Sequence, residues 1–281
     1  MPADAARLAV CSWSLKPTSC DELIAKLEQT GLTRIQLHLD PIAAGDEGWQ
    51  NTPAKLAQAG ITVVSGMVGC HGEDYSTIEA IERTGGVVPD ATWPITRENF
   101  VQASNLAGDM GLKLVTFHAG FIPAAPDHPT RQTSRERLAD VAAIFSANGV
   151  AIALETGQES AATLESMLAD LGGEVGVNFD PANMLLYGSG EPVAALRALT
   201  ARLKQVHLKD AVASGQAGEW GDEVPVGTGQ VDWAGFFDAL DAARFTGDLV
   251  IEREAGDDRV GDVQHAVSWL KTEGYVAGDT R

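Results

Sequence analysis

The sequence is short of basic residues, cysteines and long hydrophobic runs, and each shortage argues against a class of protein. Its 281 residues include 20 Lys and Arg against 39 Asp and Glu, a formal net charge of -19. Such a chain would repel a polyanion, so we expect no nucleic-acid partner. The three cysteines, Cys11, Cys20 and Cys70, are an odd number without a C-x-x-C pair. This argues against a disulfide framework or a structural zinc site.

No run of about 18 apolar residues is present, and residues 1–8 lack the basic and apolar regions of a signal peptide. We therefore expect a soluble, cytoplasmic protein without a membrane partner. The sequence also lacks a G-x-G-x-x-G segment after a strand and a G-x-x-x-x-G-K-[ST] segment. These absences disfavour a dinucleotide-binding open sheet and a dedicated phosphate loop. With 44% hydrophobic residues, the chain is long enough for one barrel or two small domains.

Short β-branched runs alternate along the chain with longer stretches whose apolar residues recur at helical spacing. The eight predicted strands are LAVCSW near Leu8, RIQLHL near Ile35, ITVVSG from Ile61, LKLVTFH from Leu112, VAIALE from Val150, EVGVNFD from Glu174, LKQVHL from Leu203 and DLVIERE from Asp248. The predicted helices are 21–29, 52–59, 97–111, 134–147, 160–171, 192–200, 232–243 and 261–271. Eight such units predict one domain, residues 1–281, folded as a single (β/α)8 TIM barrel.

The connections between these predicted elements differ in length. Three strand-to-helix connections are long and rich in Pro, Gly and polar residues: 67–96, 119–133 and 209–230. In a TIM barrel the strand-to-helix loops build the active-site face. The longest loops therefore lie where function is expected.

Four predicted strands carry an acidic or imidazole side chain near the C-terminal edge. These residues are Glu155, Asp180, His207 and Glu252. Alone, each would more often be a helix cap, an ion pair or a buried structural residue. Together at one depth they should converge on the barrel axis, where three carboxylates would repel one another unless a cation bound them. We predict one divalent metal ion; oxygen-rich ligands favour Mn²⁺ or Mg²⁺, and Zn²⁺ or Co²⁺ are possible.

Two further histidines and a lysine lie on the same rim. His38 ends the second predicted strand and His118 the fourth. Each is predicted either to face a substrate or orient a ligand carboxylate, or to be a buried structural histidine. Lys209 follows His207 closely, and it either neutralises charge that develops on a substrate oxygen or lies on the surface.

Three other side chains complete the candidate substrate site. Gln158 and Asn183 each lie three residues beyond a predicted metal ligand. They are expected to hydrogen-bond sugar hydroxyls or to cap the helices that follow. Trp13, at the end of the first strand, and Trp220, in the long seventh loop, either form an apolar wall for a sugar face or pack into the core.

These segments together resemble the xylose isomerase-like, or sugar phosphate isomerase/epimerase, TIM-barrel family over nearly the whole chain. The matching segments are ALETGQES, VNFDPANMLLYGSGEPV, VHLKD, VPVGTGQVDW and LVIEREAG. The resemblance implies a Glu-Asp-His-Glu metal site at Glu155, Asp180, His207 and Glu252. It also implies that Glu155 and Glu252 transfer protons beside a substrate carbonyl, through an enediolate.

The chain departs from the ketose 3-epimerases of this family at two positions. Those epimerases carry His where this chain has Asn183, and Arg where it has Ala213. The residues that would hold a ketohexose are thus changed, and the DPAN segment looks more like the branch with inosose dehydratase-like proteins. Abasic-site endonucleases share the fold but need further metal ligands and a basic face, which an acidic chain with six histidines does not supply.

Three functions therefore remain open for a small-molecule carbohydrate ligand, and the sequence leaves open whether the chain forms a homo-oligomer. The leading hypothesis is a metal-dependent isomerase or epimerase of a neutral sugar or keto-polyol. The second is a lyase that dehydrates a keto-inositol or keto-sugar. The third is a non-catalytic sugar-binding barrel, in which Glu155→Gln would have no activity to remove.

Overall fold

The chain folds into a closed barrel of eight parallel strands, as predicted. The computed structural model describes residues 2–172, 175–216 and 218–277. The barrel strands are β1 (Leu8–Cys11), β2 (Arg34–His38), β3 (Thr62–Met67), β4 (Leu114–Phe117), β5 (Ala151–Glu155), β6 (Gly176–Phe179), β7 (Leu203–Leu208) and β10 (Leu249–Ile251). Their order is β1-β10-β7-β6-β5-β4-β3-β2. Glu174, where the sixth strand was predicted to begin, lies outside the described residues.

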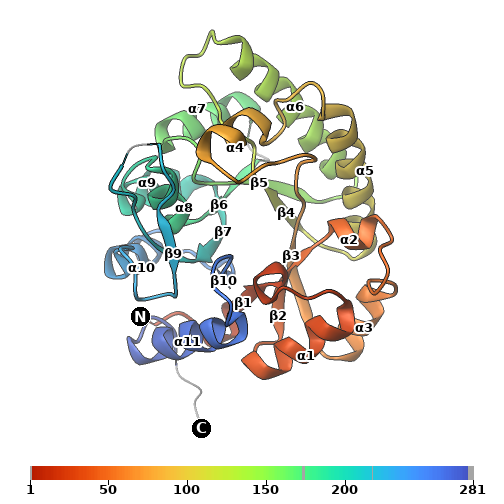
Figure 1. The fold of residues 1–281 in the computed structure, drawn as a ribbon, viewed down its shortest axis with the longest axis vertical. Coiled ribbons are helices and arrows are strands. Elements are labelled where there is room, and N and C mark those ends of the chain that lie inside the picture. The colour runs from red at the N-terminus through yellow and green to blue at the C-terminus, as the bar shows by residue number, and fades with distance from the viewer. Residues whose placement is uncertain (1, 173–174, 217, 278–281) are drawn as a thin grey trace.

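The helices surround this ring of strands (Figure 1). They are α1 (Cys20–Thr30), α2 (Asp40–Ala43), α3 (Thr52–Gln58), α4 (Ile78–Thr84), α5 (Trp93–Asp109), α6 (Pro129–Ser146), α7 (Ala161–Leu171), α8 (Pro181–Tyr187), α9 (Pro192–Leu199), α10 (Trp233–Ala242) and α11 (Arg259–Thr272). Apolar strand residues such as Ile35, Phe117 and Val206 are buried in the large core cluster. As predicted, each of the eight barrel strands is followed by at least one helix.

Two helices begin about one turn earlier than the sequence predicts. The helix expected from residue 97 starts at Trp93, and the helix expected from residue 134 starts at Pro129. Each carries a proline in its first turn, where the missing N–H costs no hydrogen bond. The Nδ1 atom of His128 also accepts the Thr130 N–H and caps the second helix.

The long loops contain structure that the sequence did not predict. Helix α4 lies inside the connection 67–96, and α8 follows β6 directly. The connection 209–230 contains an antiparallel pair, β8 (Asp210–Val212) and β9 (Asp222–Val224). These elements are too short to show a period in the sequence, and they cover the C-terminal end of the barrel.

The interior of the barrel contains a layer of buried polar side chains beneath its C-terminal end. In each strand, side chains alternate between the barrel interior and the surrounding helices. The inward positions of five strands hold Gln36, Ser65, Thr116, Asn178 and Gln205, all at most 1% exposed. They hydrogen-bond across the barrel, with Ser65 Oγ donating to Gln205 Oε1 at 2.6 Å. This polar layer forms the floor below the strand ends.

Candidate functional site

The four predicted metal ligands meet at the C-terminal end of the barrel. Glu155 is the last residue of β5, Asp180 follows β6, His207 lies in β7 and Glu252 follows β10. One ligand atom from each lies within 4.8 Å of every other, and all four residues are buried. Parallel register brings Asp180 level with His207, since the residues directly before them, Phe179 and Val206, are paired, and Glu252 lies two residues beyond Val250, the partner of His207.

The carboxylates gather around one nitrogen of the imidazole. His207 Nδ1 lies 3.4 Å from Glu155 Oε1, 3.5 Å from Asp180 Oδ2 and 3.3 Å from Glu252 Oε2. Both Nδ1 and Asp180 Oδ2 are buried and have no hydrogen-bond partner among the described residues. Buried polar atoms are normally paired. Two unpaired acceptors that face the same point are therefore well suited to bind a cation.

The charges of the cluster shift the pKa values of its members. Without a cation, burial lowers the pKa of His207, but the charge of Glu252 outweighs this effect and holds the pKa well above its ordinary value, so a bound cation would have to displace the proton from Nδ1. Burial raises the pKa of Glu252, yet Lys209 and His207 bring it below its ordinary value. The pKa of Glu155 is also below its ordinary value, because the charges of His118 and His207 outweigh its burial, so both glutamates stay charged inside the protein. Three carboxylates and one imidazole form an oxygen-rich ligand set that fits a hard divalent ion.

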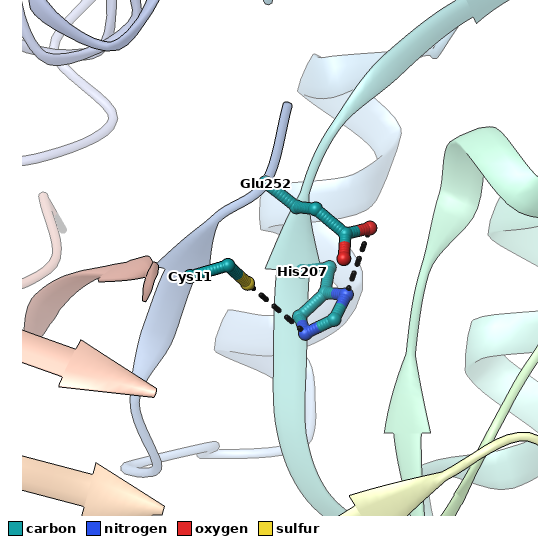
Figure 2. A group of neighbouring side chains, drawn as sticks. All are labelled: Cys11, His207 and Glu252. Carbon is teal, nitrogen blue, oxygen red and sulfur yellow. Dashed lines mark hydrogen bonds and ion pairs between the residues drawn. The ribbon is translucent and has the colours of Figure 1, made fainter. Parts of the chain in front are cut away.

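The opposite edge of the imidazole faces a thiol. Figure 2 shows Cys11 and Glu252 approaching different nitrogens of His207. Cys11 Sγ lies 3.7 Å from Nε2. The three residues could also hold a metal by proximity, but burial raises the pKa of the Cys11 thiol. The thiol therefore keeps its proton and is a poor ligand.

Lys209 is buried beside the cluster, which excludes the surface position that the sequence left open as an alternative. Its side chain is 1% exposed. The Nζ atom donates to Glu252 Oε2 at 3.0 Å, to Glu254 Oε2 at 2.5 Å and to Asn183 Oδ1 at 3.2 Å. Burial lowers the pKa of Lys209, but Glu252 and Glu254 raise it well above its ordinary value. Lys209 therefore places a fixed positive charge next to the cluster.

Asn183 and His118 contact the other predicted proton-transfer group. Asn183 Nδ2 donates to Glu155 Oε1 at 2.9 Å, so this amide joins Glu155 to Lys209. His118 Nε2 lies 3.5 Å from the same oxygen. The His118 Nδ1 atom is buried without a hydrogen-bond partner among the described residues.

A cavity of about 400 Å³ opens onto the cluster. Its polar lining consists of Glu73, Glu155, Glu252, Glu254, Lys209, His118 and Asn183. Its aromatic lining consists of Tyr75, Phe117, Tyr187 and Trp220. Tyr187 and Trp220 pack edge to face, with ring centroids 4.7 Å apart. The cavity thus combines a polar end with an aromatic wall, as ligand pockets usually do.

The other three predicted substrate-binding residues lie beside the cavity rather than in its lining. Trp13 Nε1 donates to Glu252 Oε1 at 2.9 Å. His38 Nε2 lies 3.0 Å from Asp40 Oδ2, and Gln158 Nε2 donates to the Tyr187 hydroxyl at 3.4 Å. Trp13 thus contacts the cluster and Gln158 the aromatic wall of the cavity, whereas the partner of His38 belongs to neither.

Sequence reasoning missed several residues of the cavity. Glu254 is two residues beyond Glu252, and in an extended segment such residues point the same way. This spacing of two residues was the signal in the sequence that could have predicted Glu254 in the cavity lining. Tyr75 and Glu73 lie in the long connection before α4, where no period predicts a direction. The carboxylate of Glu73 accepts the N–H groups of Gly86 and Cys70, so it braces the loop that carries Tyr75.

Asp210 explains why the VHLKD and VGTGQVDW segments occur together. Its buried carboxylate accepts the N–H groups of Gly227, Gly229 and Val231 and the indole N–H of Trp233. Such a concentration of donors is typical of a carboxylate that organises a loop. Asp210 therefore fixes the connection after Lys209 against the end of β7.

Glu159, between β5 and α7, gives the first testable prediction. Burial, with no compensating charge found in the described part of the chain, raises its pKa from 4.5 to about 8. The native state keeps a proton that the unfolded chain releases, so stability falls as pH rises from about 4.5 to about 8. We expect Glu159→Gln to raise the free energy of unfolding near pH 7 by about 2–3 kcal/mol. Urea denaturation of the wild type and the variant near pH 4.5 and near pH 8 measures the difference in the free energy of unfolding. A difference that did not grow between these two pH values would contradict the prediction.

Comparisons with known proteins agree with the fold. The family model described as xylose isomerase-like TIM barrel matches residues 24–273. The crystal structure of a xylose isomerase domain protein from Planctomyces limnophilus has 31% identity and a TM-score of 0.84, covering 96% of each chain.

Two more distant structures are similar in fold. The probable 3-DHS dehydratase AsbF from Bacillus anthracis, involved in petrobactin synthesis, has 15% identity and a TM-score of 0.72, covering 94% of this chain and 98% of its own. An L-ribulose 3-epimerase has 19% identity and a TM-score of 0.70, covering 98% and 95%. No curated protein matches the sequence. In the described residues, no helix has the length and apolar character needed to span a membrane.

Proposed function

Because the chain belongs to the xylose isomerase-like TIM barrel family, we propose that it is a divalent-metal-dependent isomerase or epimerase of a small, neutral keto-sugar or keto-polyol. The observation that carries this proposal is the buried Glu155, Asp180, His207 and Glu252 cluster at the end of a cavity. Its unpaired Nδ1 and Oδ2 atoms suit a cation. Mn²⁺ or Mg²⁺ is favoured by the oxygen ligands, with Zn²⁺ or Co²⁺ possible.

When bound, the cation would polarise the substrate carbonyl and acidify the neighbouring C–H. Glu155 and Glu252 then exchange the proton at that carbon through an enediolate. Their surroundings differ. Glu252 accepts from both the Trp13 indole and the Lys209 ammonium, whereas Glu155 accepts from the neutral amides of Asn183 and Asn178. We therefore assign proton abstraction to Glu155. A proton would return on the opposite face from the Lys209–Glu252 pair, in which the Lys209 ammonium holds it, and solvent would then restore the protonation of both groups.

The charge of the cavity supports a neutral substrate. Four carboxylates, Glu73, Glu155, Glu252 and Glu254, face it together with one lysine. A bound divalent cation would balance only part of this negative charge, and a phosphorylated sugar would still be repelled. The sugar-phosphate members of the substrate class are thus disfavoured.

Dehydration is the second candidate reaction, and the position of Lys209 favours it. Its charged Nζ atom lies beside Glu252 in the cavity lining. There it would stabilise the oxygen of a departing β-hydroxyl after the same proton is removed. The similar fold of a probable dehydratase makes this reaction a reasonable alternative for the same site.

One assay tests the proposal and separates the two reactions. The protein is incubated in D₂O with Mn²⁺ and a panel of neutral keto-sugars and keto-inositols, and followed by NMR and mass spectrometry. An isomerase or epimerase incorporates deuterium beside the carbonyl and retains the elements of water, whereas a lyase releases water. Chelation with EDTA should stop either reaction. Absence of both exchange and water loss across the panel, with Mn²⁺ bound, would favour a sugar-binding barrel instead.

A further inference from the structure

The polar layer beneath the cluster holds one amide in a fixed orientation. Gln36, in β2, is fully buried. Its Nε2 atom donates to Thr116 Oγ1 at 2.7 Å and approaches the Gly66 carbonyl oxygen at 3.4 Å. With both amide hydrogens directed at acceptors, the carbonyl must point the other way. Gln36 Oε1 accordingly lies 2.8 Å from His207 Nε2.

The other neighbours of Gln36 Oε1 support this orientation. Gln205 Nε2 donates to it at 2.9 Å, and the Cys11 thiol donates to it at 3.6 Å. Every group around Oε1 is thus a donor. Reversing the amide would turn its NH₂ group toward two other donors, which no hydrogen bond could compensate.

Asn178 competes for the same edge of the imidazole. Its Nδ2 atom lies 3.0 Å from His207 Nε2, and the same Nδ2 donates to Glu155 Oε2 at 3.3 Å. An amide nitrogen cannot accept the imidazole proton, so Gln36 is the acceptor on this edge. One of the two hydrogens on Asn178 Nδ2 goes to the carboxylate of Glu155.

A neutral imidazole carries one proton, and the hydrogen bond on one nitrogen decides which nitrogen is bare. We propose that Gln36 is a positioning residue that holds the His207 proton on Nε2 and thereby keeps the Nδ1 lone pair facing Glu155, Asp180 and Glu252. Within the described part of the chain Gln36 makes no hydrogen bond to these three carboxylates, so it acts through His207. The inference rests on the metal site of the proposed function.

The test compares Mg²⁺ binding by calorimetry in three variants. Gln36→Met keeps the length of the side chain but removes the acceptor, and we expect it to weaken Mg²⁺ binding about 10–100-fold. Gln36→Glu restores an acceptor for the Nε2 proton and should recover most of the affinity. Ser65→Ala removes a hydrogen bond to Gln205 in the same layer without touching His207, and it should bind Mg²⁺ like the wild type.

A spectroscopic measurement covers the case in which a variant fails to fold. In the wild type loaded with Mg²⁺, ¹⁵N NMR should show His207 protonated at Nε2 and bare at Nδ1. A proton on Nδ1, or Gln36→Met that binds Mg²⁺ as tightly as the wild type, would overturn this inference alone. A wild type that does not bind a divalent ion would instead overturn the proposed function.

Discussion

Glutamine in place of Glu155 should lower kcat by about 10²–10⁴-fold, the contribution typical of a positioned general base. The amide keeps a carbonyl oxygen that accepts from Asn183, and that oxygen is still able to bind a cation. It has no lone pair basic enough to take a proton from carbon. We therefore expect kcat to fall much further than the affinity for Mn²⁺. Turnover in the D₂O assay and calorimetry of Mn²⁺ binding measure the two effects separately.

The matched control for this prediction is Glu165→Gln. Glu165 is an exposed residue of α7, so the same chemical change there should leave both kcat and Mn²⁺ binding as in the wild type. Full turnover by the Glu155 variant would remove the role assigned to that carboxylate. An equal loss of turnover and metal affinity would make Glu155 a ligand only.

Methionine in place of Lys209 should destabilise the protein by about 3–5 kcal/mol, the usual cost of removing one partner from a buried ion pair. Lys209 and Glu252 are 1% and 3% exposed and 3.0 Å apart. Without the ammonium, Glu252 shares a buried site with Glu155 and Asp180 and has lost its nearest cation. Urea denaturation in the presence of EDTA measures the change in the free energy of unfolding without a contribution from bound metal.

A double-mutant cycle separates the ion pair from simple packing. Adding Glu252→Gln to Lys209→Met should restore most of the lost stability, because the uncompensated charge is gone. Glu254→Gln in the same background should restore less, since the Glu254 side chain is 53% exposed and already solvated. If Glu252→Gln gave no recovery, the cost would have to come from lost packing of the lysine chain.

The sequence was sufficient to predict the barrel and the four residues of the cluster. Strand and helix periods differ strongly, and a charged side chain in a buried strand demands a partner. This argument therefore identified one residue in each of four predicted strands: Glu155, Asp180, His207 and Glu252. The closed parallel barrel then brought them to one depth.

The rest of the site could not be read from periodicity. Gln36 and Gln205 lie in strands that alternate polar and apolar residues, a pattern that fits either a solvated or an inward-facing polar side. Lys209 has a residue type that is rarely buried without a partner, and its partner Glu254 lies in a different connection. Tyr75 and Trp220 depend on loop conformation, which has no repeating pattern in the sequence.

The hydrogen-bonded floor of the barrel has an evolutionary consequence. Gln205 is linked to Ser65, Gln36 and Asn178, so a single apolar replacement at any of these positions leaves a buried donor or acceptor unpaired, at a cost of about 1–3 kcal/mol. Replacing several members together by well-packed apolar residues avoids that cost. Among relatives that keep the cluster we therefore expect positions 36, 65, 178 and 205 to stay polar together, and to change together rather than one at a time.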